Sequence, residues 1–289
     1  MAGVNETIDL LFTADAAYLK HIAVTLISLY INDPGYKYSV NIITKASGSD
    51  DADMLRRLCV RIGYSCFWYS PEEGVFENAP TTDRYPADMY QRLLAGKVLP
   101  KELDKVIYLD GDTLIINPLH PLWEYEMNGK IFLAATHITE GQGMESLNQI
   151  RLGTSGRYYN TGVIVMDLKK MREQVRVEDI SRYLAGNRMP LLLPDQDVFN
   201  ALYGEQIDVI PDSIWNYDAR KYTKYLTGSG GEYNERWVME NTAVLHYCGR
   251  SKPWNPYYPY RFGHIYLHYE SMCRRLLEQN DRSYRAKIS

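Results

Sequence analysis

The chain has 289 residues, of which 45% are hydrophobic and 24% charged, and its formal net charge is −4. This balance is that of an ordinary globular protein, and the net negative charge argues against a nucleic-acid partner. No apolar run approaches the roughly 20 residues of a membrane-spanning helix, and the N-terminus lacks the pattern of a signal peptide. The four cysteines form no C-x-x-C pair, so we expect free thiols and a cytoplasmic location.

Hydrophobic periodicity predicts a chain of alternating strands and helices. Strands are predicted at residues 8–12, 38–44, 66–69, 105–109, 131–135, 162–166, 207–210 and 243–247. Helices are predicted at residues 18–30, 50–62, 88–98, 194–203 and 265–279. The opening elements favour a parallel, doubly wound sheet. Since no repeat or linker divides the chain, we expect a single α/β domain with a mixed, mostly parallel central sheet.

The acidic pair, Asp110 and Asp112, is separated by Gly111 and lies between two apolar segments. The strand at 106–109 precedes the pair, and the apolar run at 113–116 follows it. Two carboxylates between buried runs are costly unless a cation compensates them, and carboxylate oxygens are common ligands of divalent cations. Gly111 lets the backbone turn and a ligand approach closely. We interpret the acidic pair as a metal site at the end of a strand, and a polar turn is the alternative.

Two other interpretations of the Asp-x-Asp pattern are weaker. The same pattern at residues 51–53 and 195–197 opens predicted helices, where acids complement the helix dipole. An aspartate-nucleophile phosphatase also places Asp-x-Asp after an apolar strand. Such enzymes usually have a Gly between the second Asp and a Thr, whereas Thr113 follows Asp112 directly. Their motif also normally opens the chain, so we disfavour this rival.

A second group of residues follows the strand at 243–247 in the pattern His246-x-x-Gly249-x-x-Lys252-Pro253-Trp254. His246 can supply an imidazole ligand to the cation of the acidic pair. Gly249 lets a phosphate approach the backbone, and Lys252 offers it a positive charge. Trp254 and the proline before it would stiffen the loop. A lone His is otherwise a core residue and a lone Lys a surface charge, but the spacing favours the functional interpretation.

This pattern resembles the most specific motif of glycosyltransferase family 8, a family of retaining enzymes. The family includes bacterial lipooligosaccharide α-galactosyltransferases and α-glucosyltransferases, and glycogenin. The resemblance extends from Leu10 to Trp254. It implies a GT-A fold in which Asp110, Asp112 and His246 bind Mn²⁺, with Mg²⁺ as the alternative ion.

The resemblance also implies a donor-binding set and two catalytic residues. The donor-binding residues are Thr13, Ala14, Asp15, Tyr18, Arg92, Asp110, Gly111, Asp112, Asn160, Gly249 and Lys252. In that set, Asp15 and Tyr18 would hold the uridine. Arg92 would contact the sugar and phosphates. The catalytic residues would be Gln196 and Asp195, next to the anomeric carbon of the sugar.

Several of these residues also have a local structural interpretation. Asp15 and Asp195 could cap the helices that follow them. Arg92 could be a surface charge on its helix, and Asn160 could be a turn residue. In the case of the caps, the structural and the functional roles do not exclude each other.

The predicted reaction moves a hexose, galactose or glucose, from a UDP-sugar to a glycan or lipopolysaccharide-type acceptor with retention. Same-face attack through an oxocarbenium-like state is the expected route. A covalent intermediate on Gln196 or Asp195 is the alternative. A sugar-nucleotide binding protein without turnover is a second class, and the presence of both metal-binding and sugar-binding groups disfavours it.

Two parts of the chain are distinguished by composition. The predicted GT-A domain covers residues 1–255, and residues 256–289 form a helical tail. Residues 261–289 contain six basic and three acidic side chains, so their net charge is 6 − 3 = +3. With its aromatic residues, this segment is suited to weak contact with an anionic inner-membrane surface. A packed terminal helix with a solvated end is the simpler alternative.

Overall fold

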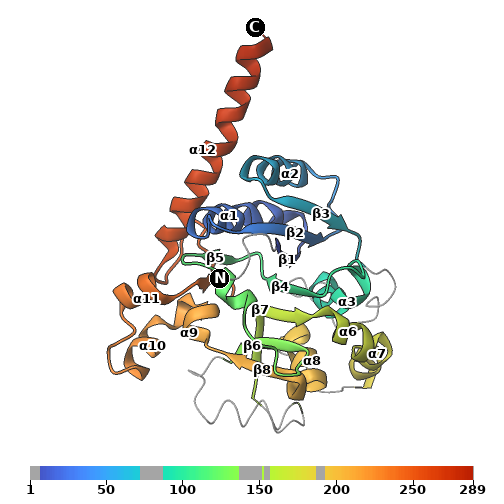
Figure 1. Cartoon of the computed structure of the whole chain (residues 1–289). Helices are drawn as coiled ribbons and strands as arrows, with labels where there is room; N and C mark the ends of the chain where they lie inside the picture. Colours follow the sequence, from blue (N-terminus) through green and yellow to red (C-terminus); the bar gives the residue numbers. More distant parts are fainter. Residues whose placement is uncertain (1–6, 72–86, 137–151, 153–156, 187–192, 289) are drawn as a thin grey trace.

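The computed structural model describes residues 7–71, 87–136, 152, 157–186 and 193–288 (Figure 1). In this part of the chain, the main sheet has seven strands in the order β3-β2-β1-β4-β7-β6-β8. Their bounds are β1 (Thr7–Thr13), β2 (Lys37–Ile43), β3 (Ser65–Tyr69), β4 (Lys105–Leu109), β6 (Phe132–Thr136), β7 (Tyr159–Asp167) and β8 (Ile207–Ile210). Strand β7 is antiparallel to both of its neighbours, and the other pairs are parallel. The predicted mixed, mostly parallel α/β sheet is confirmed.

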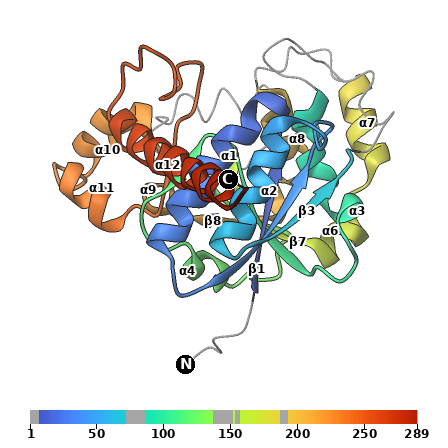
Figure 2. The same ribbon diagram turned by 90° about the horizontal axis from the view of Figure 1, so that it is seen from above.

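Helices cover both faces of this sheet. The helices of the described residues are α1 (Ala16–Asn32), α2 (Asp50–Ile62), η1 (Ala87–Leu94), α3 (Ala95–Val98), α4 (His120–Trp123), α6 (Leu168–Gln174), α7 (Val177–Gly186), α8 (Pro194–Tyr203), η2 (Gly204–Gln206), α9 (Asp212–Trp215), η3 (Ala219–Lys221), α10 (Tyr222–Gly228), α11 (Glu235–Asn241) and α12 (Gly263–Ile288). Helices α1 and α2 lie on one face, and α3, α6 and α8 lie on the other (Figures 1 and 2).

The strand residues alternate between these two layers. Leu10 and Phe12 of β1 belong to the cluster that packs under α1 and α2. Leu11, between them, packs with Tyr108 of β4 in the cluster that faces α3, α6 and α8. Strands β1 and β4 are therefore apolar on both faces, which explains why residues 10–12 and 106–109 are continuous hydrophobic runs without alternation.

A small second sheet lies beside the main one, in the order β5-β10-β9. Its strands are β5 (Thr113–Ile115), β9 (Tyr217–Asp218) and β10 (Val244–His246). Strand β10 runs antiparallel to β5 and parallel to β9. The chain passes from β4 to β5 through residues 110–112, so the acidic pair lies where the two sheets meet.

Helix α12 begins against the body of the protein and then projects away from it (Figure 1). Tyr266 and Cys273, in its first half, are buried, and Phe262, just before it, joins them in the core. Tyr266 also lies within hydrogen-bonding distance of His21 on α1 (2.7 Å). Among the described residues, no helix is both long and apolar enough to cross a bilayer.

Three expectations about the elements need correction. The helix predicted at 88–98 is a 3₁₀ segment, η1, followed by the single turn of α3. Strands β5 and β9 and the short helices α4, α6, α9, α10 and α11 were not predicted, because segments of two to seven residues carry little periodicity. The ten-residue helix α7 was also not predicted. Helix α12 extends nine residues beyond the predicted end at residue 279, where polar residues replace the apolar stripe.

Candidate active site

The acidic pair lies in a turn that is anchored to both sheets. The backbone N–H of Asp110 donates to the carbonyl of Gly162 on β7 at 2.8 Å. The backbone N–H of Tyr247, just after β10, donates to the carbonyl of Asp112 at 3.0 Å. Backbone pairing therefore brings the end of β4, the start of β7 and the end of β10 to one place.

Three potential metal-ligand atoms face one another at this junction. They come from Asp110, Asp112 and His246, and all lie within 4.8 Å of one another. Nε2 of His246 is 3.3 Å from Oδ1 of Asp112 and 3.7 Å from Oδ2 of Asp110. Ligand atoms about 2 Å from one ion are roughly 3–4 Å apart, and two carboxylates with an imidazole suit a divalent transition metal. The donor set therefore fits a divalent cation.

The second polar atom of each candidate ligand already has a partner. These partners are Arg92 for Oδ1 of Asp110 (2.9 Å), Lys252 for Oδ2 of Asp112, and Asn216 for Nδ1 of His246 (2.8 Å). The three remaining atoms are consequently turned toward one another. Such outer partners orient metal ligands before the ion arrives.

Electrostatics favours a positive ion at this position. Burial alone would raise the pKa of Asp112, but Lys252 and His246 lower it well below its usual range. Burial raises the pKa of Asp195 despite the nearby guanidinium of Arg92. Three carboxylates, those of Asp110, Asp112 and Asp195, face the two cationic side chains of Arg92 and Lys252. Although burial lowers the pKa of His246, Cys248 and Asp112 raise it well above its usual value, so without an ion the imidazole keeps a proton that a bound cation would replace.

Two glycines permit the close approaches in the site. A Cβ on Gly162 would lie 2.6 Å from Nδ1 and 3.0 Å from Nε2 of His246, so the imidazole occupies space that any side chain would fill. Gly249 has φ +89°, and a Cβ there would lie 2.6 Å from Nη1 of Arg220. The positive φ at Gly249 is readily adopted only by glycine, which explains this residue in the loop after β10.

The residues predicted to contact the sugar, Asn160, Asp195 and Gln196, lie next to the three candidate metal ligands. Nδ2 of Asn160 donates to Oε1 of Gln196 at 3.1 Å. Nε of Arg92 lies 3.5 Å from Oδ2 of Asp195. Because Arg92 also pairs with Asp110, its guanidinium links the two parts of the predicted site.

The predicted uridine-side residues lie at the end of β1 and the start of α1. They are Thr13, Ala14, Asp15 and Tyr18. Asp15 caps α1 by accepting from the backbone N–H of Tyr18 at 3.1 Å, which confirms the local interpretation of this residue. A Cβ on Gly111 would lie 3.0 Å from the Tyr18 ring, so this ring covers the turn of the acidic pair.

The loop after β10 is held against α1 and α12. Nζ of Lys252 donates to the carbonyl of Tyr247 at 2.9 Å. The Trp254 ring stacks on the His21 ring with centroids 3.6 Å apart, and His21 pairs with the hydroxyl of Tyr266. These contacts position Lys252 between Asp112 and the covering aromatic rings.

Three local interpretations from the sequence are wrong. Arg92 is 7% exposed and ion-paired, so it is not a surface charge. Asn160 lies within β7 and not in a turn. Helix α8 has Leu193 at its N-cap, and Asp195 is inside the first turn, because Pro194 takes the first helical position.

Sequence reasoning missed several residues that shape this site. Gly162 lies in the segment that contains Asn160, but nothing in a single sequence shows that an imidazole packs on it. Tyr108 donates to Oδ1 of Asp110 at 2.7 Å, and it was assigned only to the strand. Asn216 reaches His246 from a segment 30 residues away, and no local pattern marks it.

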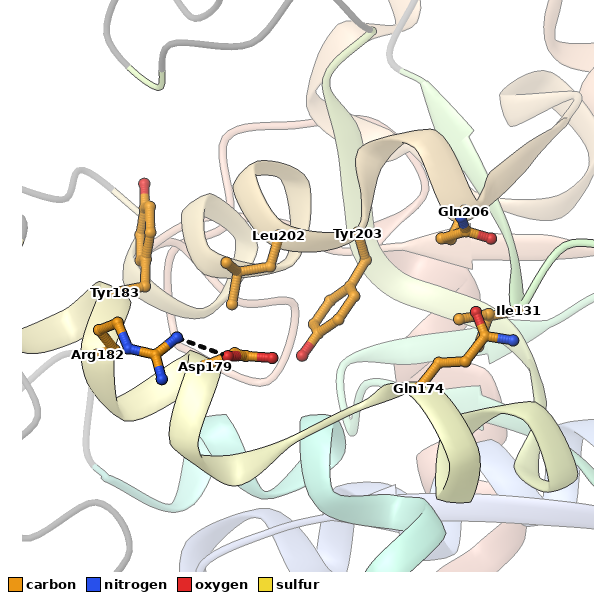
Figure 3. Close-up of a pocket in the computed structure, with 8 residues that line it drawn as sticks. All are labelled: Ile131, Gln174, Asp179, Arg182, Tyr183, Leu202, Tyr203 and Gln206. Atoms are coloured by element: carbon orange, nitrogen blue, oxygen red, sulfur yellow. Dashed lines mark hydrogen bonds and ion pairs between the residues drawn. The ribbon is translucent and has the colours of Figure 1, made fainter.

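Another pocket, of about 470 Å³, lies outside this site (Figure 3). Ile131 and Gln206 in its lining precede β6 and β8, so it opens at the opposite edge of the sheet from the acidic pair. Its lining includes an exposed ion pair between Asp179 and Arg182 (2.8 Å). None of the predicted site residues lines it.

Comparison with known proteins agrees with this geometry. The family model for glycosyl transferase family 8 matches residues 9–257. The chain belongs to glycosyltransferase family 8. This family 8 chain is 25% identical to general stress protein A of Bacillus subtilis (strain 168), over 93% of its length and 95% of that protein. It is 23% identical to a lipopolysaccharide 1,2-glucosyltransferase of Escherichia coli, over 89% of its length and 76% of that protein.

A solved structure shares the fold of this family 8 chain. The galactosyltransferase LgtC, solved in complex with donor and acceptor sugar analogs, superposes with a TM-score of 0.75 and 21% identity. The match covers 92% of this chain and 96% of LgtC. The protein is thus a glycosyltransferase with the GT-A fold, and the predictions of family and fold are confirmed.

Proposed function

We propose that this glycosyltransferase moves a hexose, galactose or glucose, from a UDP-sugar to a glycan or lipopolysaccharide-type acceptor. We propose Mn²⁺ as its cofactor, with Mg²⁺ as the alternative. The observation that carries the proposal is the convergence of the acidic pair and His246, each with its second polar atom already bound. The names of the glucosyltransferase and galactosyltransferase relatives support a hexose donor.

Asp110, Asp112 and His246 would hold the cation. When bound there, the ion supplies positive charge that stabilises the diphosphate as a leaving group. The partial exposure of Asp110, 24% for its side chain, leaves one side of the cluster open to the donor. An open side is what a catalytic metal site needs, because such a site keeps a coordination position for its substrate.

Lys252 would contribute a second positive charge to the leaving diphosphate. In the structure its ammonium pairs with Asp112 and with a backbone carbonyl. Once a cation compensates Asp112, Lys252 is free to turn to the phosphates without leaving a buried carboxylate unpaired. Gly249, three residues earlier, would let the same phosphates approach the backbone.

Gln196 and Asp195 would face the sugar. As the bond to the diphosphate breaks, positive charge develops on the anomeric carbon, and the oxygens of these two side chains would stabilise it. Attack of the acceptor on the same face retains the configuration, and the departing phosphate takes the proton of the acceptor hydroxyl. Arg92 pairs with Asp195, which weakens this carboxylate as a nucleophile. This pairing favours same-face attack over a covalent intermediate on Asp195.

The uridine would lie over the end of β1. Asp15 uses one carboxylate oxygen to cap α1, and its other oxygen remains for the uracil or ribose. Tyr18 would contact the base with its ring, beside Trp254. Thr13 and Ala14 would line this part of the donor site.

Donor hydrolysis separates the proposed function from its two alternatives. With Mn²⁺, the purified protein should release UDP from UDP-galactose or UDP-glucose, at least slowly to water, and leave p-nitrophenyl phosphate intact. Donor binding without any turnover would favour a sugar-nucleotide binding protein. Phosphatase activity that disappears in Asp110→Asn would favour the aspartate-nucleophile phosphatase.

We further propose that residues 1–255 form the catalytic domain and residues 256–289 a tail that touches an anionic cytoplasmic membrane surface weakly. The support is the net charge of +3 over residues 261–289 and the projection of α12 from the body (Figure 1). Exposed aromatic residues lie just before this helix, with Tyr257 at 81% and Tyr260 at 40%. Basic and aromatic side chains together suit the headgroup region.

A further inference from the structure

One fully buried amide lies between the candidate metal ligands and the residues predicted to contact the sugar. Asn216, between α9 and β9, has 0% of its surface exposed. Its Oδ1 lies 2.8 Å from Nδ1 of His246, and its Nδ2 donates to Oδ1 of Asn160 at 2.8 Å. Asn160 in turn donates to Oε1 of Gln196 at 3.1 Å. Hydrogen bonds therefore run without interruption from a candidate metal ligand to the predicted reaction centre.

The direction of each hydrogen bond in this series is determined independently at the Asn160 end and at the His246 end. The backbone N–H of Gly162, which can only donate, lies 2.9 Å from Oδ1 of Asn160. That atom is therefore the amide oxygen, and the amide nitrogen of Asn160 must face Gln196. At the other end, a metal-binding Nε2 of His246 carries no proton. The proton is then on Nδ1, which donates to Oδ1 of Asn216.

Both ends require the same orientation and the same chemistry at residue 216. The side chain must accept from His246 and donate to Asn160, and the asparagine amide does both at once. A carboxylate could only accept. An apolar side chain would leave the imidazole N–H and the Asn160 oxygen each short of a buried partner, which is costly.

We propose that Asn216 is a positioning residue that couples the metal ligand His246 to Gln196; this assignment rests on the proposed function. Its Oδ1 keeps His246 in the tautomer whose Nε2 can bind the cation. Its Nδ2 holds Asn160, which occupies one lone pair of the Gln196 carbonyl oxygen and thereby sets the direction of the other. Asn216 itself touches neither the donor nor the ion.

Two substitutions separate the two roles of this amide. Asn216→Ala removes both hydrogen bonds, so we expect Mn²⁺ affinity to fall about 10–100-fold and kcat to fall with it. Asn216→Asp keeps the acceptor for His246 and removes the donor to Asn160. It should bind Mn²⁺ as tightly as the wild type or tighter, while kcat for UDP-sugar hydrolysis falls about 10–100-fold at an unchanged KM. The Mn²⁺ affinity is measured by electron paramagnetic resonance of the free ion, without nucleotide.

Asn41→Ala is the matched control, because Asn41 is a buried asparagine of β2 (1% exposed) that donates to the carbonyl of Leu10. It should lower the melting temperature and leave Mn²⁺ affinity unchanged. In addition, the kcat losses of Asn216→Asp and Gln196→Ala should not add, since both act on one side chain.

Two results would overturn the proposal. The first is wild-type Mn²⁺ affinity in Asn216→Ala, and the second is an equal loss of Mn²⁺ affinity in Asn216→Asp and Asn216→Ala. A wild-type protein that binds Mn²⁺ but turns over no UDP-sugar would instead contradict the proposed function. In that case the comparison of Mn²⁺ affinities still decides whether Asn216 orients His246.

Discussion

Gly162→Ala is expected to abolish metal-dependent donor binding while the chain remains folded. The added methyl carbon would lie 2.6 Å from Nδ1 and 3.0 Å from Nε2 of His246, and closer still to Cε1. Ordinary contacts between such atoms are about 3.5–4.0 Å, so the imidazole must retreat by at least about 1 Å. The ring has little freedom to do so, because Asn216 holds Nδ1 at 2.8 Å and β10 is paired on both sides.

The size of the effect follows from this displacement. Misplacing a group in the site by about 1 Å can cost about 10²-fold in rate, and overpacking a core typically costs about 1–3 kcal/mol of stability. Calorimetric titration of UDP in Mn²⁺ measures the loss of binding. Hydrolysis of UDP-sugar measures the loss of turnover, and thermal unfolding of the same sample measures stability.

Gly96→Ala provides the matched control for overpacking. A Cβ on Gly96 would lie 2.9 Å from Cβ of Met171 and 3.3 Å from the backbone nitrogen of Arg172, between α3 and α6. This variant should lose stability and keep its Mn²⁺-dependent UDP affinity. Wild-type UDP affinity in Gly162→Ala would refute the reasoning, as would an equal loss of affinity in Gly96→Ala.

Three further predictions concern the ligands, the core and the tail. Asp112→Ala and His246→Ala should weaken Mn²⁺-dependent UDP binding and turnover together. In contrast, Gln196→Ala should keep UDP affinity in calorimetry and lose about 10²–10³-fold in kcat, and normal turnover would mean that the reaction centre lies elsewhere. Burial lowers the pKa of His21 from 6.5 to about 4, so between these values the unfolded chain binds a proton that the folded chain does not. The free energy of unfolding should therefore fall by up to about 3 kcal/mol as the pH drops from 6.5 to 4. In chemical denaturation, the free energy of unfolding of His21→Phe should depend less steeply on pH over this range. A pH dependence equal to that of the wild type would contradict the lowered pKa of His21. Finally, sedimentation with anionic vesicles at low salt should decrease when the chain is cut after Glu278, beyond the buried part of α12, and a full-length protein that ignores such vesicles would exclude the membrane contact.

The fold could be predicted where a segment's own pattern determines its structure. The run before Asp110 is apolar at every position because β4 is buried on both faces, and α2 has one apolar stripe because one face meets the sheet. The antiparallel direction of β7 could not be predicted, since direction depends on connections and not on the strand itself. The first half of the chain, with its regular alternation, was therefore more predictable than the second.

The candidate site shows the same limit. Local chemistry and the family motif identified Asp110, Asp112, His246 and Lys252, because each lies at the end of an apolar strand or in the loop after it. The side chains that hold them were not predictable. Asn216 reaches the site only because β9 pairs with β10, and that pairing exists only in three dimensions.

Titrating UDP into the protein with Mn²⁺ and again with EDTA tests the central claim most directly. If the acidic pair and His246 hold a cation that binds the diphosphate, UDP should bind far more tightly in Mn²⁺ than in EDTA. In Asp112→Ala this difference should largely disappear, although Lys252 and the uridine-side residues remain. Equal UDP affinity in the two buffers, or an undiminished Mn²⁺ effect in Asp112→Ala, would contradict the account.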